Sequence, residues 1–481
     1  MFKYSVSVAV MTAMIGVAAT LSPPAQAAED QELAQIRAEI REMKAAYESR
    51  IQALEARLQQ AATAAPAVAA APSASSAPSA SAAASASFAP SVSSAPFAPA
   101  RQAATGSNTF NPAVSLILGG TYTNLSQDPA RYRIQGFMPG PDIGPGARSF
   151  NLGESELTLA ANIDPQFSGR LTFSLAADNT VSVEEAFFES LGLSNGLNLK
   201  AGRFLSSVGY LNSQHAHTWD FIDAPLAYQA FFGGQLKPDG VQVRWLAPTE
   251  RFFEVGAEAG RGASFPGTDR NKNGLGSAAI FAHLGDDIGE SSSWRAGLSY
   301  LHTGARDRTY EDFDTAGAAV ANAFSGTSHT WIADAIYKWA PNGNATQRNF
   351  KLQGEYFQRK EMGTLTSTTK SGNFSSTQSG WYAQTVYQFM PSWRVGLRHD
   401  RLNSGTPSIG LVDDGTLSAN DFQRLASFKP RRNTVMVDYS PSEFSRFRLQ
   451  FARDQARPEA TDNQIFIQYI MSLGAHGAHT F

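Results

Sequence analysis

RLTFSL, residues 170–175, indicates the fold class. Its apolar residues alternate with polar ones, so Leu171, Phe173 and Leu175 would share one face of an extended chain. The same period of two recurs in VQVRW at 241–245 and in IFIQYIMSL at 465–473. Alternation of this kind predicts β-strands with one apolar side and one polar side.

Sixteen such runs follow one another in the second part of the chain. Most have the length of about 9–11 residues that a tilted strand needs to cross a bilayer. The runs are 114–124, 152–162, 168–177, 183–191, 197–204, 239–247, 252–260, 277–284, 293–302, 330–339, 350–358, 380–390, 392–401, 433–440, 444–454 and 464–473.

The gaps between the runs alternate between short and long. The long gaps are 125–151, 205–238, 261–276, 303–329, 359–379 and 402–432. Short turns on one side and long loops on the other are typical of an outer-membrane barrel. The gaps at 178–182 and 455–463 are shorter than this pattern requires, and the turn at 340–349 is longer. We expect an all-β, 16-stranded antiparallel transmembrane β-barrel rather than a soluble sandwich or propeller.

The segments before the barrel predict an exported protein. Residues 1–27 have a basic start, an apolar core and a small-residue cleavage site, so we expect a signal peptide rather than a membrane anchor. Residues 28–60 predict a periplasmic coiled-coil helix, with a lone amphipathic helix as the alternative. Residues 61–109 are rich in Ala, Ser and Pro and predict a disordered linker. The barrel is then expected over 110–481, in the outer membrane of a Gram-negative bacterium.

Composition excludes several function classes. The net charge of −3 gives no basis for nucleic-acid binding. The chain has no cysteine, so disulfides do not contribute to its stability. It contains no GxSxG elbow and no P-loop, and we expect no enzyme activity.

The stretch HAHTWDFIDAP, at 215–225, falls in the longest gap, which is the third outer loop of the predicted barrel. It admits three interpretations. His215, His217, Asp220 and Asp223 could line a pore constriction. His215 and His217 could instead bind a transition metal such as zinc, because both rings of a His-X-His in an extended segment lie on one side. Finally, the histidines could satisfy loop backbone groups and bind nothing.

Two other stretches bear on metals. GTDRNKNGLG, at 267–276, has part of the spacing of a calcium loop but lacks the terminal Glu, so a turn built from Asn, Asp and Gly is the simpler expectation. His476 and His479 form a second histidine cluster in the C-terminal tail. In the predicted topology that tail is periplasmic and the third loop is not, which weakens a shared metal site. No resident cofactor is expected, with zinc and calcium as the open alternatives.

If the apolar faces point to lipid, the polar faces line the lumen. The predicted basic residues of this lining are Arg170, Lys200, Arg244, Arg295, Lys351, Arg394, Arg398, Arg446 and Arg448. The predicted acidic residues are Glu154, Glu156, Glu185, Glu189, Glu254, Glu258 and Glu355. This mixture predicts a transverse field with a mild anion preference, while simple solvation of the charges is the alternative.

The stretch at 204–267, together with SSSWRAGLSYL at 291–301 and the GAHGAHTF tail, resembles a largely uncharacterised family of proteobacterial outer-membrane proteins. That family is similar to the phosphate-selective porins, which are 16-stranded trimers, and some of its members are labelled zinc-regulated TonB-dependent receptors. Phosphate-selective porins line the pore with a basic ladder, whereas acids and bases are mixed here. The segment before the barrel holds nothing able to fold as a plug, so a TonB-dependent mechanism is not expected.

Together these features predict an outer-membrane porin, a homotrimer surrounded by lipid and lipopolysaccharide. It would admit small hydrophilic solutes or ions by passive diffusion, through a pore narrowed by the third loop. The alternatives are a zinc-linked uptake protein that uses the histidine clusters, and a structural envelope tether in which the coiled coil is the working part.

Overall fold

The computed structural model describes residues 112–153, 155–313 and 317–474. The predicted signal peptide, coiled coil and linker lie outside the described residues, as do Glu154, His476 and His479. The predictions made for them stay predictions.

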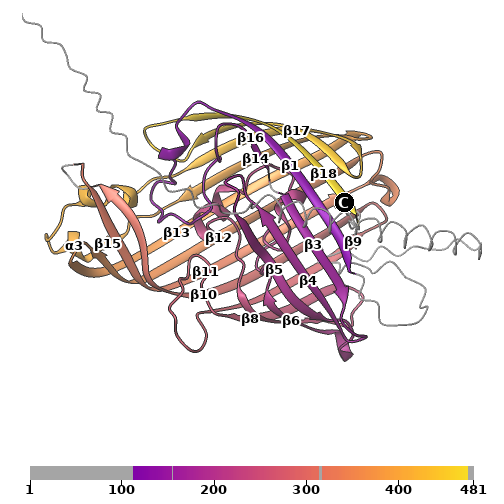
Figure 1. The fold of residues 1–481 in the computed structure, drawn as a ribbon, viewed down its shortest axis with the longest axis horizontal. Coiled ribbons are helices and arrows are strands. Elements are labelled where there is room, and N and C mark those ends of the chain that lie inside the picture. The colour runs from indigo at the N-terminus through magenta and orange to yellow at the C-terminus, as the bar shows by residue number, and fades with distance from the viewer. Residues whose placement is uncertain (1–111, 154, 314–316, 475–481) are drawn as a thin grey trace, which may run out of the picture. The chain divides into compact units, whose positions relative to one another are not determined.

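The described strands form one closed antiparallel barrel of 16 wall strands, as predicted (Figure 1). Each wall strand pairs with the next along the chain, and β1 pairs with β18 to close the ring. The first strands are β1 (Ala113–Leu125), β2 (Ser149–Leu152), β3 (Ser155–Asn162), β4 (Phe167–Leu175), β5 (Val181–Ser190), β6 (Leu197–Arg203), β7 (Asp239–Leu246), β8 (Phe252–Gly260) and β9 (Ser277–Ile288). The others are β10 (Ser292–Phe313), β11 (Ala319–Trp339), β12 (Asn349–Ser367), β13 (Lys370–Met390), β14 (Trp393–Asn403), β15 (Ser408–Ile409), β16 (Arg431–Ser442), β17 (Ser445–Gln455) and β18 (Asp462–Gly474).

Two of these elements add no wall strand. β2 and β3 both pair with β1, at successive heights, and together make one wall strand that is interrupted after Leu152. β15 is a two-residue strand beside β13. Each of the sixteen predicted runs therefore corresponds to a wall strand.

The helices are short. They are η1 (Pro129–Arg131), η2 (Ser194–Gly196), η3 (Ala216–Thr218), α2 (Leu226–Phe232), η4 (Pro341–Gly343), α3 (Gly410–Asp413) and η5 (Ala419–Leu425). None of the helices in the described ranges is both long and apolar enough to span a membrane.

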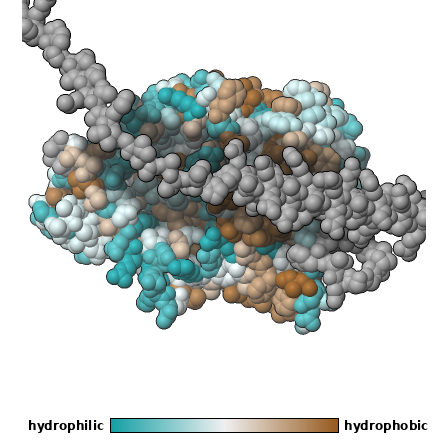
Figure 2. Space-filling model, viewed as in Figure 1, coloured by the Kyte–Doolittle hydropathy of each residue, from teal (hydrophilic) through white to brown (hydrophobic). Residues whose placement is uncertain are grey.

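The outward face of the wall is apolar where the alternation predicts it. In β7, Val241, Val243 and Trp245 are 44%, 44% and 36% exposed, while Gln242 between them is fully buried on the inside. On the face drawn in Figure 2, hydrophobic residues gather in the middle and at the lower right of the coloured surface, and hydrophilic residues gather at the lower left. An apolar outside and a polar inside are the arrangement that a bilayer-spanning barrel requires.

Two predicted long loops are wrong. Residues 303–329 and 359–379 mostly continue the strands, so that β10 with β11 and β12 with β13 form tall hairpins. The inward side chains of these extensions pack into an apolar cluster that includes Phe324, Leu365 and Phe374. The segment carrying α3 and η5 contributes Leu411 and Phe422 to the same cluster. The extensions are therefore stabilised by burial against another loop, which local alternation could not reveal.

Candidate functional site: the third loop inside the barrel

The segment between β6 and β7, residues 204–238, lies inside the barrel; we call it the third loop. Its side chains and backbone contact inward residues of β3, β5, β8, β12, β14, β16 and β17. These strands are spread around the ring, so a segment that touches all of them must cross the interior. The predicted inward path of this loop agrees with these contacts.

An apolar cluster packs one side of the third loop against the wall. The helix α2 is wholly buried, and its Phe231 stacks on Phe357 of β12 with ring centroids 5.5 Å apart. Tyr228 lies edge-on to the same ring at 5.2 Å. The helix ends at Gly233, whose φ of 64° is the left-handed conformation that glycine adopts without strain. Burial of this helix fixes the position of the loop in the lumen.

Buried carboxylates of the wall hold the loop backbone. Glu258 accepts hydrogen bonds from the Ser206 hydroxyl at 2.6 Å and the Ser207 N–H at 2.8 Å. Glu355 accepts the N–H groups of Tyr210 and Leu211 at 3.1 and 2.9 Å. Both acids were predicted to face the lumen and both do so, but their partners could not be read from the sequence.

The two predicted constriction aspartates are paired with basic residues of the wall. Asp220 contacts Lys351 and also Arg394, the latter at 3.4 Å. Asp223 contacts Arg398 at 2.9 Å and Arg432 at 2.5 Å. Burial opposes ionisation of Asp223, but the two guanidinium groups outweigh it and lower the pKa of this carboxyl to about 2. Both aspartates therefore fasten the loop as anions.

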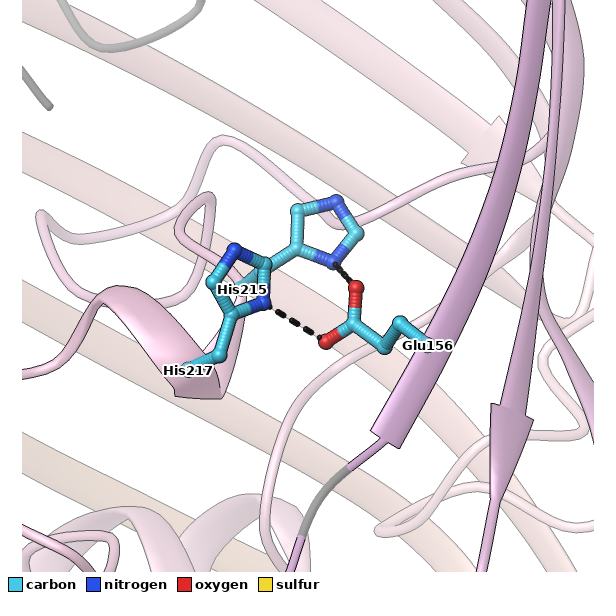
Figure 3. A group of neighbouring side chains, drawn as sticks. All are labelled: Glu156, His215 and His217. Atoms are coloured by element: carbon cyan, nitrogen blue, oxygen red, sulfur yellow. Dashed lines mark hydrogen bonds and ion pairs between the residues drawn. The ribbon is translucent and has the colours of Figure 1, made fainter. Parts of the chain in front are cut away.

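The two histidines lie at another part of the loop, in and beside η3. Nδ1 of His217 is 2.9 Å from Oε1 of Glu156, and Nδ1 of His215 is 3.0 Å from Oε2 of the same carboxylate. Figure 3 shows both rings turned toward Glu156, which projects from β3. The structure therefore brings together two residues predicted as ligands and one predicted only as pore lining.

Further acids surround His215. Its Nε2 lies 3.0 Å from Glu185, and its Nδ1 lies 3.4 Å from Glu184. Burial disfavours the charged imidazole, but Glu156, Glu184 and Glu185 outweigh it and hold the pKa of His215 well above its ordinary value. The buried carboxylates thus favour a positive charge at this position.

Glu184 is the site residue that sequence reasoning missed. Along β5, Glu185 pairs with Thr172 and Val183 pairs with Phe173, so Glu184 is an extra residue in the register. This β-bulge lets Glu184 and Glu185 both point inward, whereas strict alternation would send one of them to lipid. Two adjacent glutamates break the alternation of this strand, and that break is the sequence signal that could have indicated the bulge.

The remaining predicted lining residues that the structure describes also face inward, mostly in pairs. Arg244 contacts Glu189 at 2.7 Å, and Arg295 contacts Asp334 at 3.1 Å. Arg446 and Arg448 donate hydrogen bonds to the carbonyls of His217 and Trp219. The other residues keep the same orientation: Arg170 lies 3.8 Å from Glu185, Lys200 stands over the Phe187 ring, and Glu254 bonds to His283. Their function as a pore lining stays a prediction.

The predicted calcium stretch forms a turn. Asp269 accepts the N–H of Asn271 at 3.0 Å and pairs with Arg261. Gly274 has a φ of 89°, and residues 271–275 are exposed. The guanidinium group of Arg261 thus pairs with Asp269, the carboxylate that would be the first ligand of a calcium loop.

A polar cavity of about 330 Å³ runs beside the third loop. Its wall side is formed by β1, β2, β4, β5 and β18, through Thr121, Asn151, Ser174, Glu184 and Gln468. Its loop side includes His217, Asp223 and Lys237. Another side of the cavity is formed by Asp142, Gly144, Pro145 and Gly146, which belong to the loop between β1 and β2. The histidine and glutamate group therefore borders an open space in the lumen.

The search for a matching family model found none. A protein of Aquifex aeolicus, described only as uncharacterized, is 30% identical over 401 residues, which are 77% of this chain and 80% of that protein. The chain belongs to the family of this Aquifex protein. The description of this relative names no activity and no solute.

Solved structures with similar barrels are outer-membrane proteins. The trimer form of OmpT of Vibrio cholerae has a TM-score of 0.47 at 10% identity, with 76% of this chain and 99% of that chain covered. The outer membrane channel DcaP of Acinetobacter baumannii has a TM-score of 0.45 at 10% identity, covering 76% and 97%. The anion-selective porin from Comamonas acidovorans has a TM-score of 0.46 at 12% identity, covering 76% and 99%. Values this low carry no argument about residues, solutes or assembly.

Proposed function

We propose that the protein is an outer-membrane porin that admits small hydrophilic solutes by passive diffusion. The observation that carries this proposal is the polar cavity between the third loop and the wall of a barrel with an apolar outside. A closed barrel of 16 strands encloses an aqueous lumen unless something fills it. Here the third loop occupies part of that lumen, and the cavity beside it is the proposed passage.

The charges support weak ion selectivity. The sequence predicted a mild anion preference from an excess of wall bases. In the structure, Arg244, Arg295 and Arg398 each contact a carboxylate, so these charges are largely compensated. Around the cavity itself, Glu184 pairs with Lys237, and Asp223 pairs with Arg398 and Arg432. We therefore propose diffusion selected by size and polarity, with little preference for the sign of charge.

Assembly as a homotrimer in the outer membrane is part of the proposal. The apolar outward faces of the strands supply a surface for lipid and for neighbouring copies. Native mass spectrometry of the protein in detergent measures the number of copies directly. A mass of three chains is the expected result, and a monomer at all concentrations would contradict a trimer without touching the pore proposal.

Single-cysteine labelling tests the passage, because the chain has no cysteine of its own. Ser174 lines the cavity, and its neighbour Leu175 belongs to the opposite, apolar face of β4. In planar bilayers, a charged methanethiosulfonate reagent should reduce the conductance of Ser174→Cys and leave Leu175→Cys unchanged. An equal response of the two variants, or none in Ser174→Cys after confirmed labelling, would place the passage elsewhere.

A further inference from the structure

The group formed by Glu156, His215 and His217 has the donors of a metal centre. Each of the three residues offers one ligand atom, and these atoms all lie within 4.8 Å of one another. Among the residues that the structure describes, this is the one group of His, Asp and Glu side chains with that property. Two imidazole nitrogens and a carboxylate form a donor set that suits zinc and neighbouring transition metals. Glu156 is only 1% exposed and His217 9%.

The orientation of the donors supports coordination. Both histidines present Nδ1 to the same carboxylate, one to each oxygen (Figure 3). Nδ1 of His215 is buried, and no hydrogen bond of acceptable geometry reaches it despite the 3.0 Å contact with Glu156. A buried ring nitrogen of this kind is well placed to bind an ion between itself and the carboxylate.

The neighbouring acids would complete the centre. Nε2 of His215 faces Glu185 at 3.0 Å, which is the carboxylate–histidine arrangement that orients a metal ligand. Oε2 of Glu184 lies 3.4 Å from Nδ1 of His215 and likewise lacks a hydrogen bond. The β-bulge directs this second carboxylate toward His215, beside the three-residue group.

The charge balance points in the same direction. Glu156, Glu184 and Glu185 are all buried around one imidazole. Lys237 lies 3.5 Å from Glu184 and Arg170 lies 3.8 Å from Glu185, so two of the three acids have a cationic partner besides His215. Burying several carboxylates together is costly unless positive charge compensates them, and a divalent ion supplies two charges at one point.

We propose that Glu156, His215 and His217 bind a divalent transition-metal ion such as zinc, with Glu184 as a further ligand and Glu185 as the residue that positions His215. The histidines belong to the third loop and the glutamates to β3 and β5. The bound ion would therefore fasten the loop to the wall. A metal ligand must present a nitrogen lone pair, so binding of the ion releases any proton held at that nitrogen.

The ion can reach this centre from the lumen, because His217 and Glu184 both border the cavity. An ion held there would narrow the passage at that point. This consequence for conductance rests on the proposed porin function, whereas binding of the ion does not.

The other histidines in the described ranges offer poorer centres. His283 bonds to Glu254 at 3.1 Å but has no second histidine in its group. His302 and His329 are cross-strand neighbours with ring centroids 4.8 Å apart, and His329 is bonded to Tyr300. The pair His302 and His329 supplies a matched control.

Isothermal titration calorimetry tests the binding. The full-length folded protein in detergent, stripped with a chelator, is titrated with Zn²⁺ and separately with Mg²⁺. We expect one tight zinc site per chain and no comparable magnesium site, since imidazole ligands disfavour magnesium. Glu185→Gln should weaken zinc binding by about 10- to 100-fold, and Glu156→Gln or His217→Gln by more.

The double variants His302→Gln/His329→Gln and His476→Gln/His479→Gln should bind zinc as the unchanged protein does. Co²⁺ loaded into the unchanged protein should give visible absorption of a low-symmetry site, and this readout remains informative if one of the variants fails to fold. The proposal is overturned if the unchanged protein binds no zinc. It is equally overturned if binding survives Glu156→Gln and His217→Gln, or if one of the control pairs abolishes it.

Conductance separates the two proposals. Once calorimetry has established zinc binding, single channels of the unchanged protein should show lower conductance with Zn²⁺ than without it. Channels of Glu156→Gln should show the same conductance in both conditions. Zinc binding by a protein that forms no channels would leave the metal centre standing and overturn the porin function. A protein that forms channels but binds no zinc would support the porin function and overturn the metal centre.

Discussion

At the scale of the residue, the interior of the barrel consists of charges that are paired between the loop and the wall. Asp223 illustrates this: one carboxylate contacts Arg398 and Arg432 and accepts a hydrogen bond from Gln450 at 2.9 Å. Each partner belongs to a different strand. Removing one member of such a group leaves the others buried with fewer partners, which costs more than the pair itself contributes.

Asp223→Asn should lower the free energy of unfolding by about 1–3 kcal/mol, because Arg398 and Arg432 keep Asp400 as a partner but lose the loop carboxylate. Urea unfolding in detergent, followed by tryptophan fluorescence, measures the loss. The matched control is Asp142→Asn, an exposed aspartate on the same cavity, which should stay within about 0.5 kcal/mol. Equal effects of the two substitutions would contradict the anchoring role.

The same carboxylate should give the loop a dependence on acid pH. Its folded pKa is about 2 and the ordinary value is 3.8. A lowered pKa means that the stabilisation is fully present above about pH 4 and is lost as the pH falls toward 2. The stability gap between the unchanged protein and Asp223→Asn should therefore narrow from pH 5 to pH 2. A gap that stays constant over this range would show that folding does not lower the pKa of Asp223.

The inward direction of most site residues could be predicted, because a period of two assigns each side chain to a face. The partners could not. Glu156 and His217 are 61 positions apart, and only the path of the third loop brings them together. Glu184 was missed for a different reason: a strict period of two assigns it to the lipid face, and the β-bulge shifts the register locally so that it points inward.

At the scale of the element, the wall strands followed from local alternation and the hairpin extensions did not. β10 and β11 continue beyond their predicted ends because Tyr310 and Phe324 find apolar partners across the molecule. Those partners, Leu411 and Phe422, lie in a segment of short helices that no periodicity marks. Strand length at this end of the barrel is thus set by tertiary packing rather than by the strand sequence.

Two phenylalanines of this hairpin test that explanation. Phe324 is fully buried and packs edge-on to Phe374 with centroids 5.5 Å apart, whereas Phe313 is 48% exposed. Phe324→Ala should lower the free energy of unfolding by about 3–5 kcal/mol through the cavity it leaves. Phe313→Ala should change it by about 0.5 kcal/mol or less. Denaturant titration of both variants measures these changes. If Phe324→Ala leaves the free energy of unfolding unchanged, the hairpin extension forms without its apolar cluster.

At the scale of the whole molecule, the proposed passage rests on three features: the closed barrel, its apolar outside and the polar cavity beside the third loop. In the lining of the cavity, Glu184 is paired with Lys237, and Asp223 is paired with Arg398 and Arg432. In a tenfold gradient of potassium chloride, we expect a reversal potential close to zero. A potential near the limit for either ion would show that unpaired charge controls the passage and would contradict the pairing described above.

Single-channel conductance of the unchanged protein, compared with a variant in which residues 211–231 are replaced by a short Gly/Ser linker, tests the central claim most directly. The replaced segment carries both histidines, both aspartates and most of α2, and circular dichroism would confirm that the barrel remains. We predict discrete openings in the unchanged protein and markedly larger ones in the variant, because the loop is the obstacle in the lumen. Equal conductance, or no openings from inserted protein of either kind, would contradict a pore narrowed by the third loop.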